Sequence, residues 1–237
     1  MSWNECLYLY ARERGGEYFG GLYGGMDVAD GFDGMLLLEH RGQPVIVKCR
    51  ATSGRYGSSY TAQVLLRCTL ERRYQLSVSA KGAGRQGLNT VLGQLDKGAG
   101  LLNKNLDLYR DYGCPEVTGG RTIRTDDGEF TQMVFRDLEF RNALLENSRF
   151  RLRVKPSAPS FSEDLTHLVS VKCDLLASLY SQSEDWNTGD GDEWLSGKDR
   201  EQFLREGNFS QRLDALISFA KAAHGAVTAW RMPAKND

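Results

Sequence analysis

The sequence predicts an α+β fold in which an antiparallel β-sheet packs against a C-terminal amphipathic helix. Several segments alternate apolar and polar residues, as strands do when one face of a sheet is buried and the other is wet. Residues 208–230 instead carry apolar side chains at helical spacing, and Pro233 ends that pattern. Because the sheet and the helix each have one apolar face to bury, we expect them to cover one another in a single domain of residues 1–237.

Short polar turns separate the alternating segments, which favours an antiparallel meander over a parallel sheet. The longest segment, residues 60–70, is followed by the charged turn Glu71-Arg72-Arg73 and then by a further alternating segment. The turn Arg41-Gly42-Gln43-Pro44 precedes another one. The predicted strands are residues 44–50, 60–70, 73–81, 129–136, 149–155 and 165–173.

Residues 125–155 are expected to run as turn, strand, short helix and strand. Asp126-Asp127-Gly128 has turn chemistry, and the apolar residues 130–135 that follow are compatible with a strand. Asp137 can cap the helix, since its carboxylate can accept from the N–H groups that a helix start leaves unpaired. Pro156 ends the last strand, because proline cannot donate to a ladder.

Four segments have less regular patterns. Residues 5–12 fit a strand or a short helix. Residues 15–34 are glycine-rich and are expected to form a loop. Residues 88–109 fit a helix broken by glycines, and residues 182–207 are polar and acidic, as in an excursion over the surface.

The composition points to a cytoplasmic protein. With a net charge of −1, the chain has no global field that would attract nucleic acid or anionic lipid, so we expect neither as a partner. The five cysteines include no C-x-x-C pair, which favours buried thiols in a reducing compartment. The N-terminal residues lack a signal-peptide pattern, and no apolar run approaches the ~20 residues that span a bilayer.

Two short motifs carry a resemblance to known proteins. A turn ending in Gly42-Gln43-Pro44 precedes a Val-x-Val strand, and Asp127-Gly128-Glu129-Phe130 precedes a Leu-Leu helix and a further strand. Together with the closing amphipathic helix, this arrangement resembles a group of bacterial β-rich domains of unknown function. The resemblance implies a β-rich body and no particular activity or ligand. Some relatives of that kind carry a membrane anchor, and we expect none in this chain.

The candidate binding site is a cationic strand face. Four cations alternate with apolar residues before Pro156, so they share one face of the predicted strand. They are Arg149, Arg151, Arg153 and Lys155. Aligned like charges repel, and residues 184–193 form the dense acidic run of the chain. Either that run covers the face or the face binds an acidic protein partner, a phosphate or a second copy. The plainer interpretation is a solvated strand whose charges deter edge pairing.

Two further patterns suggest ligands, and we expect neither ligand to bind. Gly82-Ala83-Gly84-Arg85-Gln86-Gly87 has the spacing of a dinucleotide site. The strand before it alternates, whereas such a site follows a strand buried on both faces, so no cofactor is predicted. Asp185, Asn187 and Asp190 supply oxygen ligands at a spacing that does not fit an EF-hand loop, so no metal is predicted.

The sequence contains no catalytic motif, and its catalytic residues, if any, are unknown. The three histidines are His40, His167 and His224, and the last belongs to an apolar helical stripe. We therefore expect a non-enzymatic binding or assembly module. The alternatives are a hydrolase that uses carboxylates for acid–base chemistry and a nucleotide-binding protein that uses Gly82–Gly87.

Overall fold

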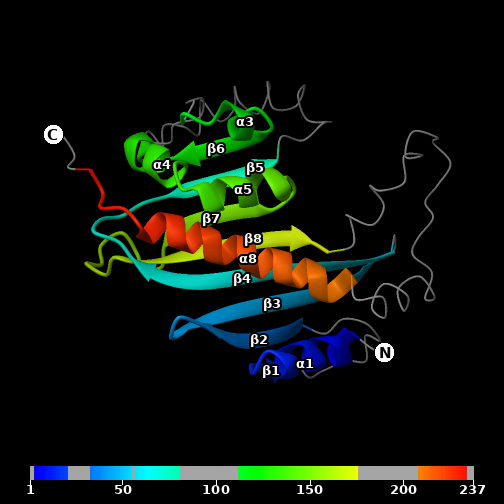
Figure 1. Ribbon diagram of the computed structural model, residues 1–237. Helices are drawn as coiled ribbons and strands as arrows, with labels where there is room; N and C mark the ends of the chain where they lie inside the picture. The colour runs from blue at the N-terminus through cyan, green and yellow to red at the C-terminus, as the bar shows by residue number, and fades with distance from the viewer. Residues whose placement is uncertain (1–2, 21–32, 55–56, 81–111, 176–207, 234–237) are drawn as a thin grey trace, which may run out of the picture. The chain divides into compact units, whose positions relative to one another are not determined.

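The computed structural model describes residues 3–20, 33–54, 57–80, 112–175 and 208–233 (Figure 1). The described helices are α1 (Trp3–Glu13), α3 (Pro115–Thr118), α4 (Gly128–Val134), α5 (Leu138–Glu146) and α8 (Asn208–Thr228). The strands are β1 (Glu17–Phe19), β2 (Asp33–His40), β3 (Gln43–Gly54), β4 (Gly57–Thr69), β5 (Leu76–Ala80), β6 (Arg121–Thr125), β7 (Arg151–Pro156) and β8 (Thr166–Asp174).

The strands form an eight-stranded antiparallel sheet in the order β1-β2-β3-β4-β8-β7-β5-β6, and α8 packs on it. This confirms the predicted α+β fold. Five predicted strands correspond to β3, β4, β5, β7 and β8. The apolar stripe of the C-terminal helix is also confirmed, since Leu213, Leu216 and Ile217 are buried in α8.

The predicted strand at residues 129–136 is wrong, because these residues lie mostly in helix α4. The Asp127 carboxylate accepts a hydrogen bond from the Phe130 N–H at 2.9 Å and so caps that helix. Phe130, Thr131 and Val134 are buried, which is the spacing of one helical face. Strand β6 was not predicted from the sequence, and its burial pattern places Ile123 inside and Arg124 outside.

Three further elements belong to segments that the sequence left open or assigned to loops. Residues 5–12 belong to helix α1, while β1 and the start of β2 lie in the glycine-rich segment 15–34. Packing explains one glycine of that segment. A Cβ at Gly16 would lie only 2.7 Å from the Leu37 carbonyl oxygen, so a side chain does not fit there. β1 is a three-residue strand that pairs with β2 at the end of the sheet. Three residues are too few to show the alternation of apolar and polar side chains by which a strand is predicted from sequence.

The chain divides into two compact units, which are described separately below. The first contains residues 1–66 and 170–220, and the second contains residues 67–169 and 221–237. Strands β4 and β8 and helix α8 each run through both units, and the prediction of a single domain stays a prediction.

In the first unit, a tight turn connects β2 to β3, and a group of three polar side chains connects α1 to α8. The β2–β3 hairpin turns at Arg41 and Gly42, whose φ angles of 53° and 74° are both positive, as a type I′ turn requires. Asp214 of α8 accepts from the Tyr10 hydroxyl at 2.6 Å and from the Arg14 guanidinium at 2.7 Å. The Arg14 guanidinium also lies 3.7 Å from the centre of the Tyr10 ring, so the two side chains that bond to Asp214 also contact one another.

All five cysteines are free thiols buried in the protein. Burial raises the pKa of the Cys68 thiol to about 11, so that group is protonated at neutral pH. Among the described helices, none combines the length and the apolar character needed to cross a membrane.

Candidate functional site

Strand β7 carries the core of the predicted cationic site. Leu152 and Val154 are buried, while Arg151, Arg153 and Lys155 are exposed on the other side of the strand. Arg149 is also exposed but precedes the strand, so it is not a member of the same regular row. The sheet order places β7 between β8 and β5.

Neighbouring strands of the second unit add two cations that the sequence did not indicate. Arg124 of β6 and Arg153 of β7 both lie opposite Ser77 of β5, one on each side. Because adjacent strands are about 4.8 Å apart, the two arginine Cα atoms lie about 10 Å apart across β5. Arg67 of β4 projects on the same face as well, since it alternates with buried Leu66 and Cys68.

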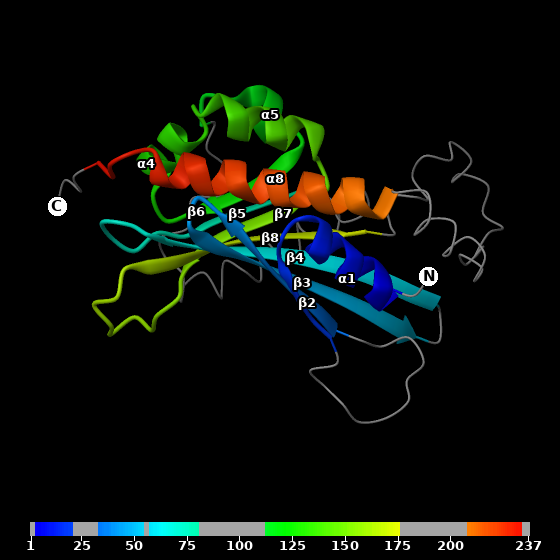
Figure 2. The ribbon, with the colours of Figure 1, turned by 60° about the horizontal axis from the view of Figure 1, so that its bottom comes forward.

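We call the set of exposed cations on these strands the cationic face. Its members are Arg67, Arg124, Arg151, Arg153 and Lys155. In Figure 2, α4, α5 and the C-terminal half of α8 lie on the other side of the strands of this unit. The remaining outward positions of the same strands hold small polar residues and one leucine: Thr69, Ser77, Ser79, Thr122, Thr166 and Leu168. These positions therefore contain no carboxylate and no aromatic ring.

The cations of β7 are not neutralised by the part of the chain that the structure describes. Arg151, Arg153 and Lys155 make no hydrogen bond or ion pair with a described residue. Arg67 differs, because its guanidinium donates to the Thr166 hydroxyl at 3.2 Å. The result is a region of concentrated positive charge among exposed side chains of the described strands.

One carboxylate lies at the rim of the cationic face. Asp164, in the segment between β7 and β8, accepts from the Thr166 N–H at 2.8 Å. Hydrogen bonding by Thr166 lowers the pKa of Asp164, and the positive charge of Arg67 adds to the effect. Asp164 is therefore ionised at neutral pH and is positioned next to Arg67 rather than next to the β7 cations.

The other two ligand-binding patterns considered from the sequence lie outside the described residues. The acidic run 184–193, with Asp185, Asn187 and Asp190, is outside them, and so is Gly82–Gly87. Among the residues that are described, no three His, Cys, Asp or Glu side chains gather in a way that could hold a metal ion. The absence of dinucleotide binding stays a prediction.

The buried histidine of β8 has a structural role. His167 Nε2 accepts from the Tyr74 N–H at 3.0 Å, and its Nδ1 lies 2.6 Å from the Leu165 carbonyl oxygen. A carbonyl can only accept, so Nδ1 carries the proton and the ring is neutral. Burial lowers the pKa of His167, and the charge of Arg73 lowers it further. His167 therefore serves the packing of β8 against the segment that leads into β5.

Several carboxylates of the described residues make similar structural bonds. Asp126 accepts from the Gln75 N–H at 2.7 Å, and Asp137 caps α5 by accepting from the Phe140 N–H at 2.8 Å. The second bond confirms the cap predicted from the sequence. Carboxylates held in this way orient the backbone, and their oxygens are occupied by structural bonds.

The turn Glu71-Arg72-Arg73 connects separate segments of the second unit. Glu71 accepts from the Met232 N–H at 3.1 Å, and Arg72 donates to the Pro233 carbonyl. Both bonds hold the segment that follows α8 against the segment that follows β4.

Arg73, the last residue of this turn, holds the connection between β7 and β8. Its guanidinium donates to the carbonyls of Ala158, Pro159 and Ser162. The connection and its Asp164 are thereby held in place at the rim of the cationic face.

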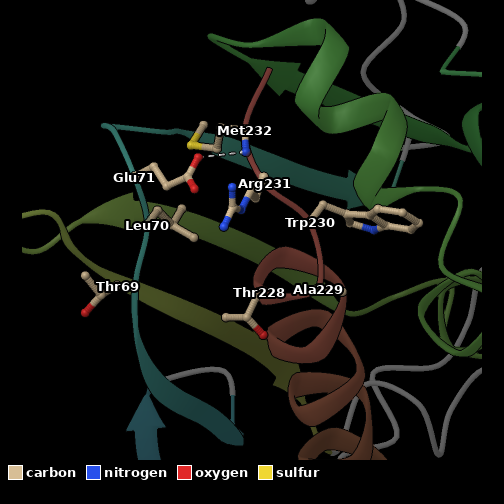
Figure 3. Close-up of a pocket in the computed structure, with 8 residues that line it drawn as sticks. All are labelled: Thr69, Leu70, Glu71, Thr228, Ala229, Trp230, Arg231 and Met232. Atoms are coloured by element: carbon tan, nitrogen blue, oxygen red, sulfur yellow. Dashed lines mark hydrogen bonds between the residues drawn. The ribbon is translucent and has the colours of Figure 1, made fainter. Parts of the chain in front are cut away.

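A pocket of about 350 Å³ lies beside the same turn (Figure 3). It is lined by Thr69, Leu70, Glu71, Thr228, Ala229, Trp230, Arg231 and Met232. Two of its polar groups are already in use, since Glu71 accepts from Met232 and the Thr228 hydroxyl donates to the His224 carbonyl at 2.8 Å. The lining includes one cation, Arg231, and one occupied carboxylate, Glu71. Its charge is lower than that of the cationic face.

Comparison of the chain with protein-family models, with curated proteins and with solved structures finds no significant match. The fold and the site together define the class of protein: an α+β protein with a C-terminal helix packed on an antiparallel sheet and, in the second unit, exposed cations on the strands.

Proposed function

We propose that the protein is a non-enzymatic binding module that holds an anionic partner on the cationic face. The observation that carries this proposal is the run of exposed cations on β7 that no described residue neutralises, flanked by Arg124 in the same row as Arg153. Like charges in one row repel, and exposed ion pairs contribute only ~0–1 kcal/mol each, so fold stability is not a sufficient reason for the arrangement.

The rival function, a hydrolase with carboxylate acid–base chemistry, receives less support. Asp126, Asp127 and Asp137 each accept a hydrogen bond from a backbone N–H, so these carboxylates hold the fold together. The buried thiols fit a reducing compartment, and we therefore place the binding module in the cytoplasm. The resemblance of the two short motifs points to a bacterial protein.

Binding of polyglutamate across a range of salt concentrations tests the proposal. We expect the double variant Arg151→Ser/Arg153→Ser to bind at least tenfold more weakly at low salt, and to show a smaller dependence on salt, because two exposed charges have been removed. Its free energy of unfolding should stay within about 0.5 kcal/mol of the parent value, as for other exposed positions.

The matched control removes two exposed charges elsewhere. Arg12→Ser/Arg136→Ser changes the net charge by the same amount at residues outside the cationic face. This control should bind polyglutamate like the parent protein. Equal loss of binding in both double variants would mean that only the net charge matters, and an absence of binding by the parent protein at low salt would refute the proposed function.

A further inference from the structure

We infer that the partner contacts β7 as an extended acidic segment whose carboxylates occur at every second residue. This inference rests on the proposed function and specifies the chemistry of the ligand. Arg151, Arg153 and Lys155 follow one another at every second position of a strand, so their Cα atoms repeat about every 6.7 Å. A second extended chain has the same repeat on each of its faces, so its alternate carboxylates match the three cations one to one.

The row through Arg153 is the strongest part of this match. Arg124 lies in that row on the far side of Ser77, so the row carries two guanidinium groups. Arginine binds a carboxylate through two parallel N–H groups, which gives geometric specificity that a diffuse charge lacks. The half-buried Ser77 and Ser79 add hydroxyl groups beside the arginines.

The position of β7 in the sheet determines how the ligand is recognised. β7 has β8 on one side and β5 on the other, so it is not an edge strand. An added strand would need free backbone groups at an edge. The ligand must therefore be recognised through the exposed side chains of the cationic face, so the spacing of its charges determines how well it binds.

The composition of the face favours a protein ligand over a nucleic acid. The outward positions of β4, β5, β6, β7 and β8 in this unit hold no aromatic residue. Proteins that bind single-stranded nucleic acid stack bases on aromatic side chains, and this surface offers none. An acidic peptide needs no such platform, since its charges are carried by short side chains at the strand repeat.

Peptides of equal composition test the inference directly on the full chain. One fluorescein-labelled peptide alternates glutamate and threonine over nine residues, and its isomer groups the five glutamates at one end and the four threonines at the other. A thymidine oligonucleotide of equal charge is the third probe. We expect fluorescence anisotropy at low salt to show that the alternating peptide binds about fivefold more tightly than either of the other two.

Substitutions then assign that preference to the row of cations. Arg153→Ser should remove the difference between the two peptides, whereas the control Arg136→Ser should retain it. Equal, salt-sensitive binding of both peptides by the parent protein would overturn the inference and leave the proposed function standing. Tighter binding of the oligonucleotide would overturn it in favour of nucleic acid. A failure to bind any of the three probes would overturn the proposed function itself.

Discussion

Arg72 and Asp127, which are 55 residues apart in the sequence, form an ion pair that joins the turn after β4 to the start of helix α4. Asp127 is only 11% exposed and Arg72 26% exposed, so the pair is partly shielded from water. The same Asp127 carboxylate also accepts from the Phe130 N–H. One side chain thus serves two purposes: it caps the helix and it receives a cation from a distant turn.

This double use predicts different costs for two substitutions. Asp127→Ala removes the cap and the ion pair, and we expect the free energy of unfolding to fall by about 2 kcal/mol. Asp127→Asn keeps an oxygen that can accept from Phe130 but removes the charge, so about half of that loss is expected. Urea denaturation measures both. Equal losses in the two variants would show that the cap contributes nothing separable.

A second prediction concerns the buried guanidinium of Arg121. This side chain is 5% exposed and donates to the carbonyls of Leu144, Asn147 and Phe150, at and just beyond the C-terminal end of α5. Burial lowers the pKa of Arg121, and the carbonyls at a helix end compensate part of that cost. Arg121→Met should lower the free energy of unfolding by about 3 kcal/mol, because it leaves these carbonyls without their donor.

The control for this experiment lies three residues away on the same strand. Arg124 points to the opposite face of β6, and Arg124→Ser should change the free energy of unfolding by no more than about 0.5 kcal/mol. The comparison separates the effect of a buried arginine from that of lost positive charge. A loss below about 1 kcal/mol for Arg121→Met would contradict the assigned role.

A third prediction concerns pH. The folded state lowers the pKa of His167 below its usual 6.5, so the unfolded chain binds a proton that the folded protein excludes. The contribution of this residue to stability is therefore complete above about pH 6.5 and is lost as the pH falls through the lowered value in the folded state. In physical terms, protonation of Nε2 breaks the bond from the Tyr74 N–H.

Unfolding experiments between about pH 5 and pH 8 measure this effect as a difference between the parent protein and His167→Gln. The amide oxygen of glutamine can still accept a hydrogen bond, but it does not titrate in this range. We expect the difference in free energy of unfolding to shrink as the pH is lowered. A constant difference over the whole range would show that His167 does not titrate with folding.

The patterns that could be interpreted from the sequence are those whose physics is local. Strands β3, β4, β5, β7 and β8 alternate because one side of each is buried, and α8 repeats its apolar residues at helical spacing for the same reason. The cap at Asp137 is equally local, since the acceptor and the donor are three residues apart. In these cases, residues that are close together in the sequence are enough to predict the element.

The misassigned segment shows where local reasoning ends. Residues 130–135 form a short apolar run, and such a run fits a strand or a buried helix equally well by its period. Its helical form is supported by Asp127, which is held in place by Arg72, and by the packing of Tyr74 against Phe130 with ring centres 4.8 Å apart. Both partners lie more than fifty residues away in the sequence.

By itself, the sequence determined the α+β class, most strands, the C-terminal helix and the cations of β7, because each depends on the period of adjacent residues. Only the tertiary structure decided which other charges join those cations. Arg124 and Arg67 belong to strands far from β7 in the chain, and the strand order brings them to the same face. Side chains on different strands become neighbours through backbone pairing, and that pairing is a property of the whole sheet rather than of any one segment.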